Sequence, residues 1–178
     1  MKRFIIRLGV AALCALSLSG CIDSSSPILT DAKPLLGERL TLQLYGMRQG
    51  FAVEPEQVAY RWNGTHYVRT RGSRSMNDFT VHAFEGGDFI VQTVPSGRSR
   101  KIEYALLHPL MDGVYYVVVI DEADADQATR STQCDKSSDY ACRVVTREQL
   151  FAFARATAAR HKDNGGLAIR LRDGSKRR

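Results

Sequence analysis

The sequence predicts an α+β domain that is mainly antiparallel β: a meander of about eight strands, forming a curled sheet or partly open barrel, with one C-terminal helix packed on it. Three observations carry this prediction. Short apolar or alternating runs are joined by glycine-containing turns, as in hairpins. One segment near the C-terminus repeats apolar residues every three or four positions, which is the period of a helix. The apolar stripe of that helix needs the face of a sheet to bury it.

The first expected strands lie in the N-terminal half of the domain. Residues 39–45 alternate apolar and polar side chains, which is typical of a strand with one buried face. Two further runs, 58–62 and 65–69, flank Asn63-Gly64. Asn-Gly between such runs favours a tight hairpin, because a type I′ turn needs a positive φ at both central residues.

Two more hairpins are expected downstream. Residues 79–84 and 89–94 surround a Gly-Gly turn, and residues 101–107 and 114–120 surround an Asp-Gly turn. The run 114–120 is almost unbroken apolar sequence, which predicts the most central strand, covered on both faces.

The last elements follow a change in composition. Residues 121–140 are polar and acidic, then rich in Ser and Thr, and predict a long loop. Thr146 and Gln149 match a capping box, so the helix should occupy residues 147–161. Residues 167–171 then predict a final strand.

The N-terminus carries a short apolar run, 8–18, behind Lys2, Arg3 and Arg7. As a helix it would span about 16 Å, whereas the apolar core of a bilayer is about 30 Å thick. The pattern therefore predicts a cleaved secretory signal rather than a membrane-spanning helix.

The signal ends in Leu18-Ser19-Gly20-Cys21, which resembles the lipobox of bacterial lipoproteins. The resemblance implies cleavage before Cys21, a diacylglycerol on its thiol, and acylation of the new amine, with palmitate as a typical chain. Two or more chains anchor a protein stably in a bilayer. Because Ile22 rather than an aspartate follows the cysteine, the resemblance favours the outer membrane. An ordinary cleaved signal and an uncleaved anchor are the alternatives.

The predicted organisation has four parts. Residues 1–20 form the signal peptide, 21–33 a Ser-rich flexible tether, 34–171 a single β-rich domain, and 172–178 a basic tail. Removing the signal lowers the net charge from +6 to +3, because it contains three basic residues and no acid. The basic composition is therefore weak evidence for a nucleic-acid partner, and none is expected.

Cys134 and Cys142 are the cysteines of the expected domain. Two cysteines in an oxidising compartment are expected to form a disulfide, and a loop this short should add about 2.5 kcal/mol to stability. Their spacing, with no histidine nearby, does not match a zinc site or a CxxC motif. The pair leaves Cys21 without a disulfide partner and available for lipid.

The sequence shows no clear catalytic constellation. The acidic run 121–126 lacks the glycine and the distal glutamate of an EF-hand loop, so we expect no metal. No nucleophile motif accompanies the four scattered histidines, of which His66 and His82 fall on strands that could be neighbours. We therefore expect no catalytic residue, no cofactor and no enzymatic activity.

The expected function is a non-catalytic binding or structural role in the cell envelope. Basic residues in or beside the connections between hairpins could share one end of the sheet and face an envelope protein or lipopolysaccharide; they are Arg69, Arg71, Arg74, Arg98, Arg100 and Lys101. One alternative is a carrier or sensor of an apolar or lipid ligand inside the curled sheet, which is loosely similar to lipocalin-like periplasmic lipoproteins. A second alternative is an envelope hydrolase.

Overall fold

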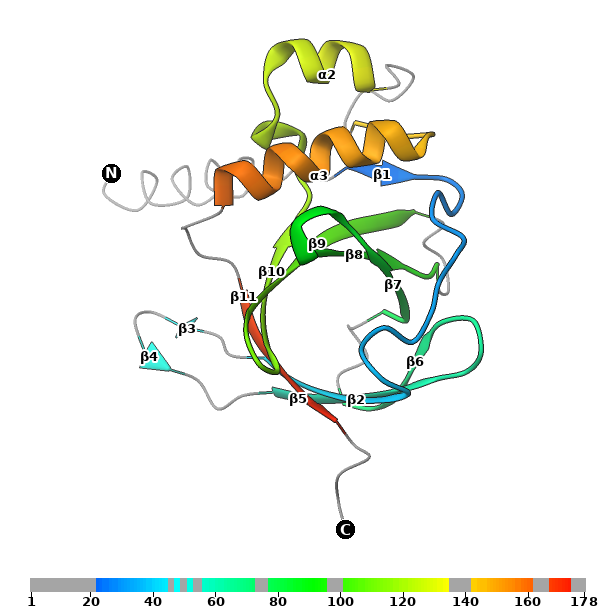
Figure 1. The fold of residues 1–178 in the computed structure, drawn as a ribbon, viewed down its shortest axis with the longest axis vertical. Coiled ribbons are helices and arrows are strands. Elements are labelled where there is room, and N and C mark those ends of the chain that lie inside the picture. The colour runs from blue at the N-terminus through cyan, green and yellow to red at the C-terminus, as the bar shows by residue number, and fades with distance from the viewer. Residues whose placement is uncertain are drawn as a thin grey trace, which may run out of the picture.

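The computed structural model describes residues 22–44, 47–48, 51–52, 56–72, 77–95, 101–134, 142–161 and 167–173. In this part of the chain, eight antiparallel strands form a closed barrel, seen along its axis in Figure 1. In order round the ring they are β2 (Arg39–Leu44), β5 (Glu56–Trp62), β6 (Tyr67–Arg71), β7 (Phe79–Ala83), β8 (Phe89–Thr93), β9 (Ile102–Met111), β10 (Val114–Val119) and β11 (Leu167–Asp173). Pairing of β11 with β2 closes the ring.

The remaining elements lie outside this ring. The short strand β1 (Asp23–Ser24) pairs with β9 just past the point where β10 leaves it, and β3 (Met47–Arg48) pairs with β4 (Phe51–Ala52). The helices are α2 (Gln127–Gln133) and α3 (Arg147–His161), with single 3₁₀ turns η2 (Glu85–Gly87) and η3 (Glu122–Asp124). In Figure 1, α3 lies across the outside of the ring near β8 and β9, and α2 lies beyond it.

The structure confirms the predicted fold class and the three hairpins, β5–β6, β7–β8 and β9–β10. Two details differ. The first turn is centred one residue later than expected, because the Asn63 N–H bonds to the His66 carbonyl and Gly64 takes the positive φ of 103°. The residues of β10 are only partly buried, with Val119 49% exposed, because a closed ring has no central strand.

The C-terminal helix is confirmed with its capping box. The Gln149 backbone N–H donates to Thr146 Oγ1 at 3.2 Å, and the Thr146 N–H donates to Gln149 Oε1 at 3.1 Å. Helix α2 was not expected, because the polar sequence of residues 121–140 predicted a long loop. It begins because the Asp126 carboxylate accepts the Thr129 N–H at 2.7 Å. Strand β11 also extends to Asp173, two residues into the predicted basic tail.

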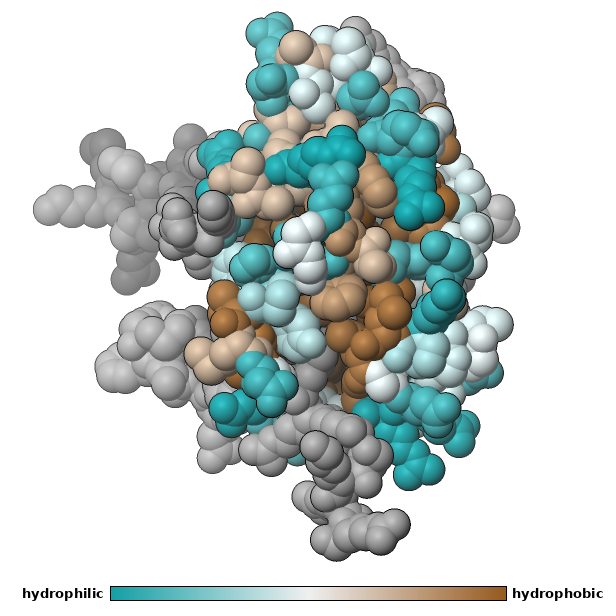
Figure 2. All heavy atoms as spheres, in the orientation of Figure 1, coloured by the Kyte–Doolittle hydropathy of each residue, from teal (hydrophilic) through white to brown (hydrophobic). Residues whose placement is uncertain are grey.

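Two separate hydrophobic cores stabilise the fold. The first fills the barrel, where Tyr60 and Tyr67 pack against Phe79 with ring centroids 4.8 and 5.1 Å apart. The ribbon in Figure 1 leaves the centre of the ring open. In the same orientation, Figure 2 shows apolar side chains, in brown, gathered at that place. The second core lies between the outer face of β8 and β9 and helix α3, and its centre includes the fully buried Leu150 and Phe153.

The predicted tether, residues 21–33, is wrong over the part that the structure describes. Ile22 is fully buried, and Leu29 is only 3% exposed. Residues 22–37 instead form a strap that starts at β1, crosses the outside of β7 and β8, and reaches the end of the barrel. Ile22 and Leu29 supply apolar contacts that the serine-rich composition obscured.

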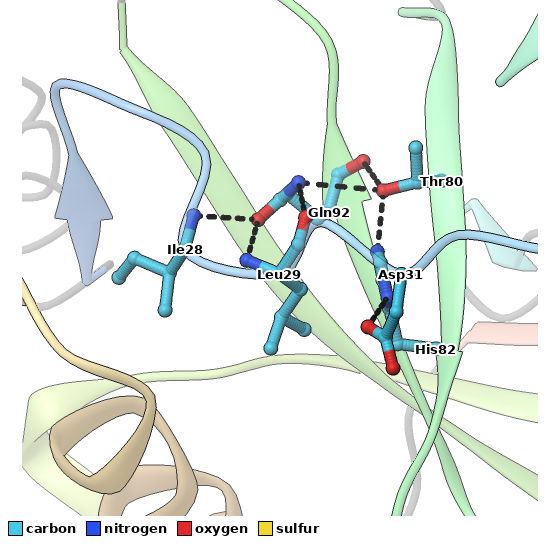
Figure 3. A network of polar contacts seen from close by, with 6 residues as sticks. All are labelled: Ile28, Leu29, Asp31, Thr80, His82 and Gln92. Atoms are coloured by element: carbon cyan, nitrogen blue, oxygen red, sulfur yellow. Dashed lines mark hydrogen bonds and ion pairs between the residues drawn. The ribbon is translucent and has the colours of Figure 1, made fainter. Parts of the chain in front are cut away.

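A buried polar network fixes the strap to the barrel wall (Figure 3). Gln92 Oε1 accepts the backbone N–H groups of Ile28 and Leu29 at 3.2 and 3.0 Å, and its amide donates to the Leu29 carbonyl at 3.0 Å. Beside it, His82 is held between Thr80 Oγ1 at 2.9 Å and Asp31 Oδ1 at 3.2 Å. The buried amide of Gln92 thus replaces the strand partner that this part of the strap lacks.

The end of the strap reaches one end of the barrel. The Tyr67 hydroxyl donates to the Gly37 carbonyl at 2.8 Å and accepts the Leu36 N–H at 3.2 Å. Leu36 itself packs against the interior core. Burial raises the pKa of Tyr67 to about 12, so this hydroxyl remains a donor at any physiological pH.

Acid is expected to loosen the strap through His82. Burial lowers the pKa of His82 below its usual 6.5, and the Asp31 contact only partly offsets this. The unfolded chain therefore binds the proton more tightly. The free energy of unfolding should fall as the pH drops from about 6.5 through the lowered pKa, by at most about 1.4 kcal/mol per pH unit. Urea unfolding between pH 7 and 5 measures this slope, and His82→Gln should flatten it; an unchanged slope in that variant contradicts the assignment.

The structure confirms the predicted disulfide between Cys134 and Cys142, whose Cα atoms are 5.0 Å apart. Cys134 lies at the end of α2, and Cys142 contacts β1, because its carbonyl accepts the Asp23 N–H at 3.2 Å. The bond therefore supports both α2 and the start of the strap.

Removal of the disulfide is expected to lower stability moderately. The double variant Cys134→Ser/Cys142→Ser should unfold with about 2.5 kcal/mol less free energy than the oxidised protein, because its unfolded state is less restricted. Urea denaturation measures the difference, and the dithiothreitol-reduced wild type is the matched control. A loss below about 0.5 kcal/mol, within the range of ordinary surface substitutions, would contradict the structural role.

A candidate binding pocket between the helix and the barrel wall

A pocket of about 420 Å³ lies on the outside of the barrel, beside the C-terminal end of α3. Its walls are the outer face of β9 and β10, the last turns of α3, and the β7–β8 turn. Its described lining residues are Gly86, Asp88, Leu106, His108, Tyr116, Ala158, Ala159 and His161. The volume is within the range of small-molecule sites.

The β7–β8 turn places Asp88 at the pocket. Gly86 and Gly87 have φ values of 68° and 89°, which glycine adopts without strain. The turn is closed by the Phe84 N–H, which donates to the Asp88 carbonyl at 2.8 Å. An ion pair between Glu85 and Arg155, 2.6 Å apart at Oε1 and Nη2, links this turn to α3. It also lowers the pKa of Glu85.

His108 and Asp88 form the central polar pair of the pocket. The histidine Nδ1 lies 2.5 Å from Asp88 Oδ1, and the Asp88 side chain is 11% exposed while the His108 side chain is 41% exposed. The carboxylate orients the ring and places the proton on Nδ1, which leaves Nε2 as an acceptor in the neutral imidazole.

A second lining histidine, His161, also contacts a carboxylate, through its Nε2. His161 Nε2 lies 3.2 Å from Asp124 Oδ2, and Arg160 Nε lies 3.4 Å from Oδ1 of the same aspartate. The Tyr116 hydroxyl donates to the His161 carbonyl at 3.1 Å, so β10 and the end of α3 are joined across the pocket. Both histidine side chains are thus oriented before any ligand arrives.

This arrangement could bind a ligand or transfer a proton. An imidazole held by a carboxylate can accept a proton as a general base. None of the described lining residues is Ser, Thr or Cys, the nucleophiles that a histidine base most often activates. Leu106, Tyr116 and Ala158 make most of the remaining lining apolar.

Sequence reasoning did not find this site. His108 and Asp88 are 20 residues apart: His108 is on β9, and Asp88 ends the β7–β8 turn. The register that pairs Phe89 with Leu107 sets Asp88 opposite His108, and only that register reveals the pair. His161 could be placed near the end of the helix, but not against β10.

The histidines that the sequence placed on neighbouring strands do not form a site. His66 lies in the β5–β6 turn and contacts Thr65 and Asn63, with Thr65 Oγ1 2.8 Å from its Nδ1. His82 is buried under the strap, as described above.

The acidic run 121–126 has structural partners in the structure. Asp121 accepts the Ala123 N–H at 2.8 Å, Asp126 caps α2, and Asp124 contacts Arg160 and His161. Glu122 lies near the sulfur atoms of Cys134 and Cys142, but these are joined to each other and therefore cannot serve as thiolate ligands.

The basic residues are only partly described. Arg74, Arg98 and Arg100, together with the tail 174–178 and the predicted acylation site Cys21, lie outside the described residues. Lys101 contacts Asp23 with 2.9 Å between Nζ and Oδ2. Arg39 and Arg61, which the sequence did not single out, stand opposite each other on β2 and β5, and both are exposed.

Comparisons of the chain with protein-family models, curated proteins and solved structures found no match. In the described part of the chain, no helix has the length and apolar character needed to cross a bilayer.

Proposed function

We propose that this protein is a lipid-anchored, non-catalytic binding protein of the bacterial cell envelope. Its anchor is Cys21 at the outer membrane, and its ligand site is the pocket beside His108. The pocket carries the binding role, because it joins an apolar floor to two histidines that carboxylates already orient. The lipobox resemblance supports the anchor, and the Cys134–Cys142 disulfide fits an oxidising compartment.

The chemistry of the lining favours a small amphipathic ligand. Leu106, Tyr116 and Ala158 can contact an apolar body, and His108 can hydrogen-bond to a single polar or acidic group. A pocket of about 420 Å³ accommodates a molecule of one or two rings rather than a whole lipid.

Two alternatives receive less support. The carrier hypothesis places a ligand within the barrel, but packed aromatic side chains, including Tyr60, Tyr67 and Phe79, occupy the interior that the described residues form. The hydrolase hypothesis gains the Asp88–His108 pair, which could act as a base, but the described lining supplies no Ser, Thr or Cys for that base to activate.

Filling the pocket is expected to weaken ligand binding without unfolding the protein. Anilinonaphthalene sulfonate, which combines two aromatic parts with one anionic group, is a suitable fluorescent probe. Ala158→Phe should weaken its binding by about tenfold or more, equivalent to about 1.4 kcal/mol, because the new ring occupies the floor. Fluorescence titration gives the dissociation constant.

Ala152→Phe is the matched control, because Ala152 is on the same helix but does not line the pocket. This variant should bind the probe as the wild type does. Equal binding by wild type and Ala158→Phe would show that the pocket is not the site, and equal weakening in both variants would show that the effect is nonspecific.

A further inference from the structure

The strap leaves no free chain between the predicted acylation site and the folded barrel. Ile22, which follows Cys21 directly, is fully buried, and its N–H donates to the Ile120 carbonyl at 3.3 Å. Asp23, the next residue, is bonded on both sides. It pairs with Glu103 of β9, and its carbonyl accepts the Val144 N–H at 2.9 Å. The described fold thus already includes the residue directly after Cys21.

Side chains strengthen this attachment. Asp23 contacts Lys101 at 2.9 Å and Arg143 at 3.6 Å, and its side chain is only 6% exposed. The Ser24 and Tyr104 hydroxyls lie 2.6 Å apart in a buried contact. Pulling residues 22–24 away from β9 would therefore break an ion pair, two backbone pairings and a buried hydrogen bond together.

The length of chain between Cys21 and Ile22 determines how far the barrel can lie from the membrane. Consecutive Cα atoms are about 3.8 Å apart, whereas a free segment of 12 residues could extend about 40 Å. If Cys21 carries acyl chains in the bilayer, Ile22 must lie at the level of the lipid headgroups.

We infer that the barrel sits directly on the bilayer surface, with the corner formed by β1, Lys101 and Arg143 against the headgroups. This inference rests on the proposed lipid anchor. This corner has two basic residues, Lys101 and Arg143, and two acidic residues, Asp23 and Glu103, so their charges balance. The position of the anchor, and not net charge, therefore brings this corner to the membrane. The occupant of this surface is the same membrane that receives the acyl chains.

Lysine reactivity can test this seating. The Lys101 side chain is 62% exposed and its amine touches Asp23, two residues from the anchor. Lys33 is also exposed, but lies near the far end of the strap. The lipidated protein in phosphatidylethanolamine–phosphatidylglycerol vesicles is treated with sulfosuccinimidyl acetate, and mass spectrometry gives the acetylation rate of each lysine. The reference is the soluble Cys21→Ser protein.

The expected result is that Lys101 reacts at least about fivefold more slowly on vesicles than in the soluble protein, because a surface within about 4 Å of Ile22 excludes the reagent. Lys33 should react at the same rate in both. Insertion of 12 Gly and Ser residues between Cys21 and Ile22 should restore the Lys101 rate, because a flexible linker of that length lifts the corner from the surface.

The outcomes separate the two proposals. If the mass of the protein showed no acyl group on Cys21, the proposed lipid anchor would be wrong, and with it the proposed function. An acylated protein whose Lys101 reacts at the soluble rate would overturn the seating and leave the anchor intact. Equal protection of Lys101 and Lys33, or protection that persists with the linker, would overturn the inferred orientation.

Discussion

Replacement of Cys21 by serine is expected to move the protein entirely from the membrane fraction to the soluble periplasmic fraction. The serine hydroxyl does not accept the diacylglycerol that the lipobox resemblance implies for the cysteine thiol. Each buried CH₂ of an acyl chain contributes about 0.8 kcal/mol to membrane binding, so loss of two or three chains removes the anchor completely. Labelling of growing cells with radioactive palmitate should likewise fall to background.

Cys14→Ser is the matched control, since Cys14 lies inside the apolar run of the signal rather than at its end. This variant should incorporate palmitate and fractionate with membranes as the wild type does. Persistent labelling of Cys21→Ser would refute lipidation at this position. Loss of labelling in both variants would point instead to impaired export.

Gln92→Leu is expected to lower the free energy of unfolding by about 3 kcal/mol and to release the strap. Leucine has a similar size but cannot bond to the strap, so the Ile28 and Leu29 N–H groups and the Leu29 carbonyl all lose their partner. Each buried backbone group left unsatisfied costs about 1–3 kcal/mol. Urea denaturation gives the change in stability. Release of the strap is measured by cleavage of the Ala32–Lys33 bond with a protease that cuts on the N-terminal side of lysine, because Pro34 prevents trypsin from cutting after Lys33.

The matched control is Gln57→Leu, because Gln57 is exposed on β5. Its stability should stay within about 0.5 kcal/mol of the wild type. If Gln92→Leu were as stable as Gln57→Leu, the strap would not depend on the buried amide. If it were destabilised but no more sensitive to cleavage at the Ala32–Lys33 bond, the amide would stabilise the barrel without holding the strap.

The local elements could be predicted because their signals are local. The hairpins and helix α3 follow from alternation, turn glycines and the Thr146–Gln149 capping box, each contained in a few neighbouring residues. The same approach failed for the strap, where one isoleucine and one leucine pack against distant partners among serines and prolines. A segment of low apolar content can be ordered if a neighbouring wall supplies its hydrogen bonds, and Gln92 does so here.

The pocket could not be predicted because it depends on register between separate elements. Asp88 meets His108 only after β8 pairs with β9, and His161 joins them only after α3 docks across that sheet. The disulfide was predictable because two cysteines only eight positions apart in the expected domain can pair in one way. Closure of the barrel could be predicted only in part. The number of expected strands suggested a curved sheet, but the pairing of β11 with β2, which closes the ring, joins distant parts of the chain.

That sealing pair also determines when the molecule can finish folding. Strand β2 is made early in the chain and waits for β11, which is made almost last. Pairing across so long a separation is slow, because a large loop must close before any contact forms. A chain that emerges from its N-terminus therefore stays an open sheet with two unpaired edges until residues 167–173 appear. During that interval the edges of β2 and β10 are open to strand addition, so a chaperone that covers exposed strands should bind the nascent chain and release it on completion.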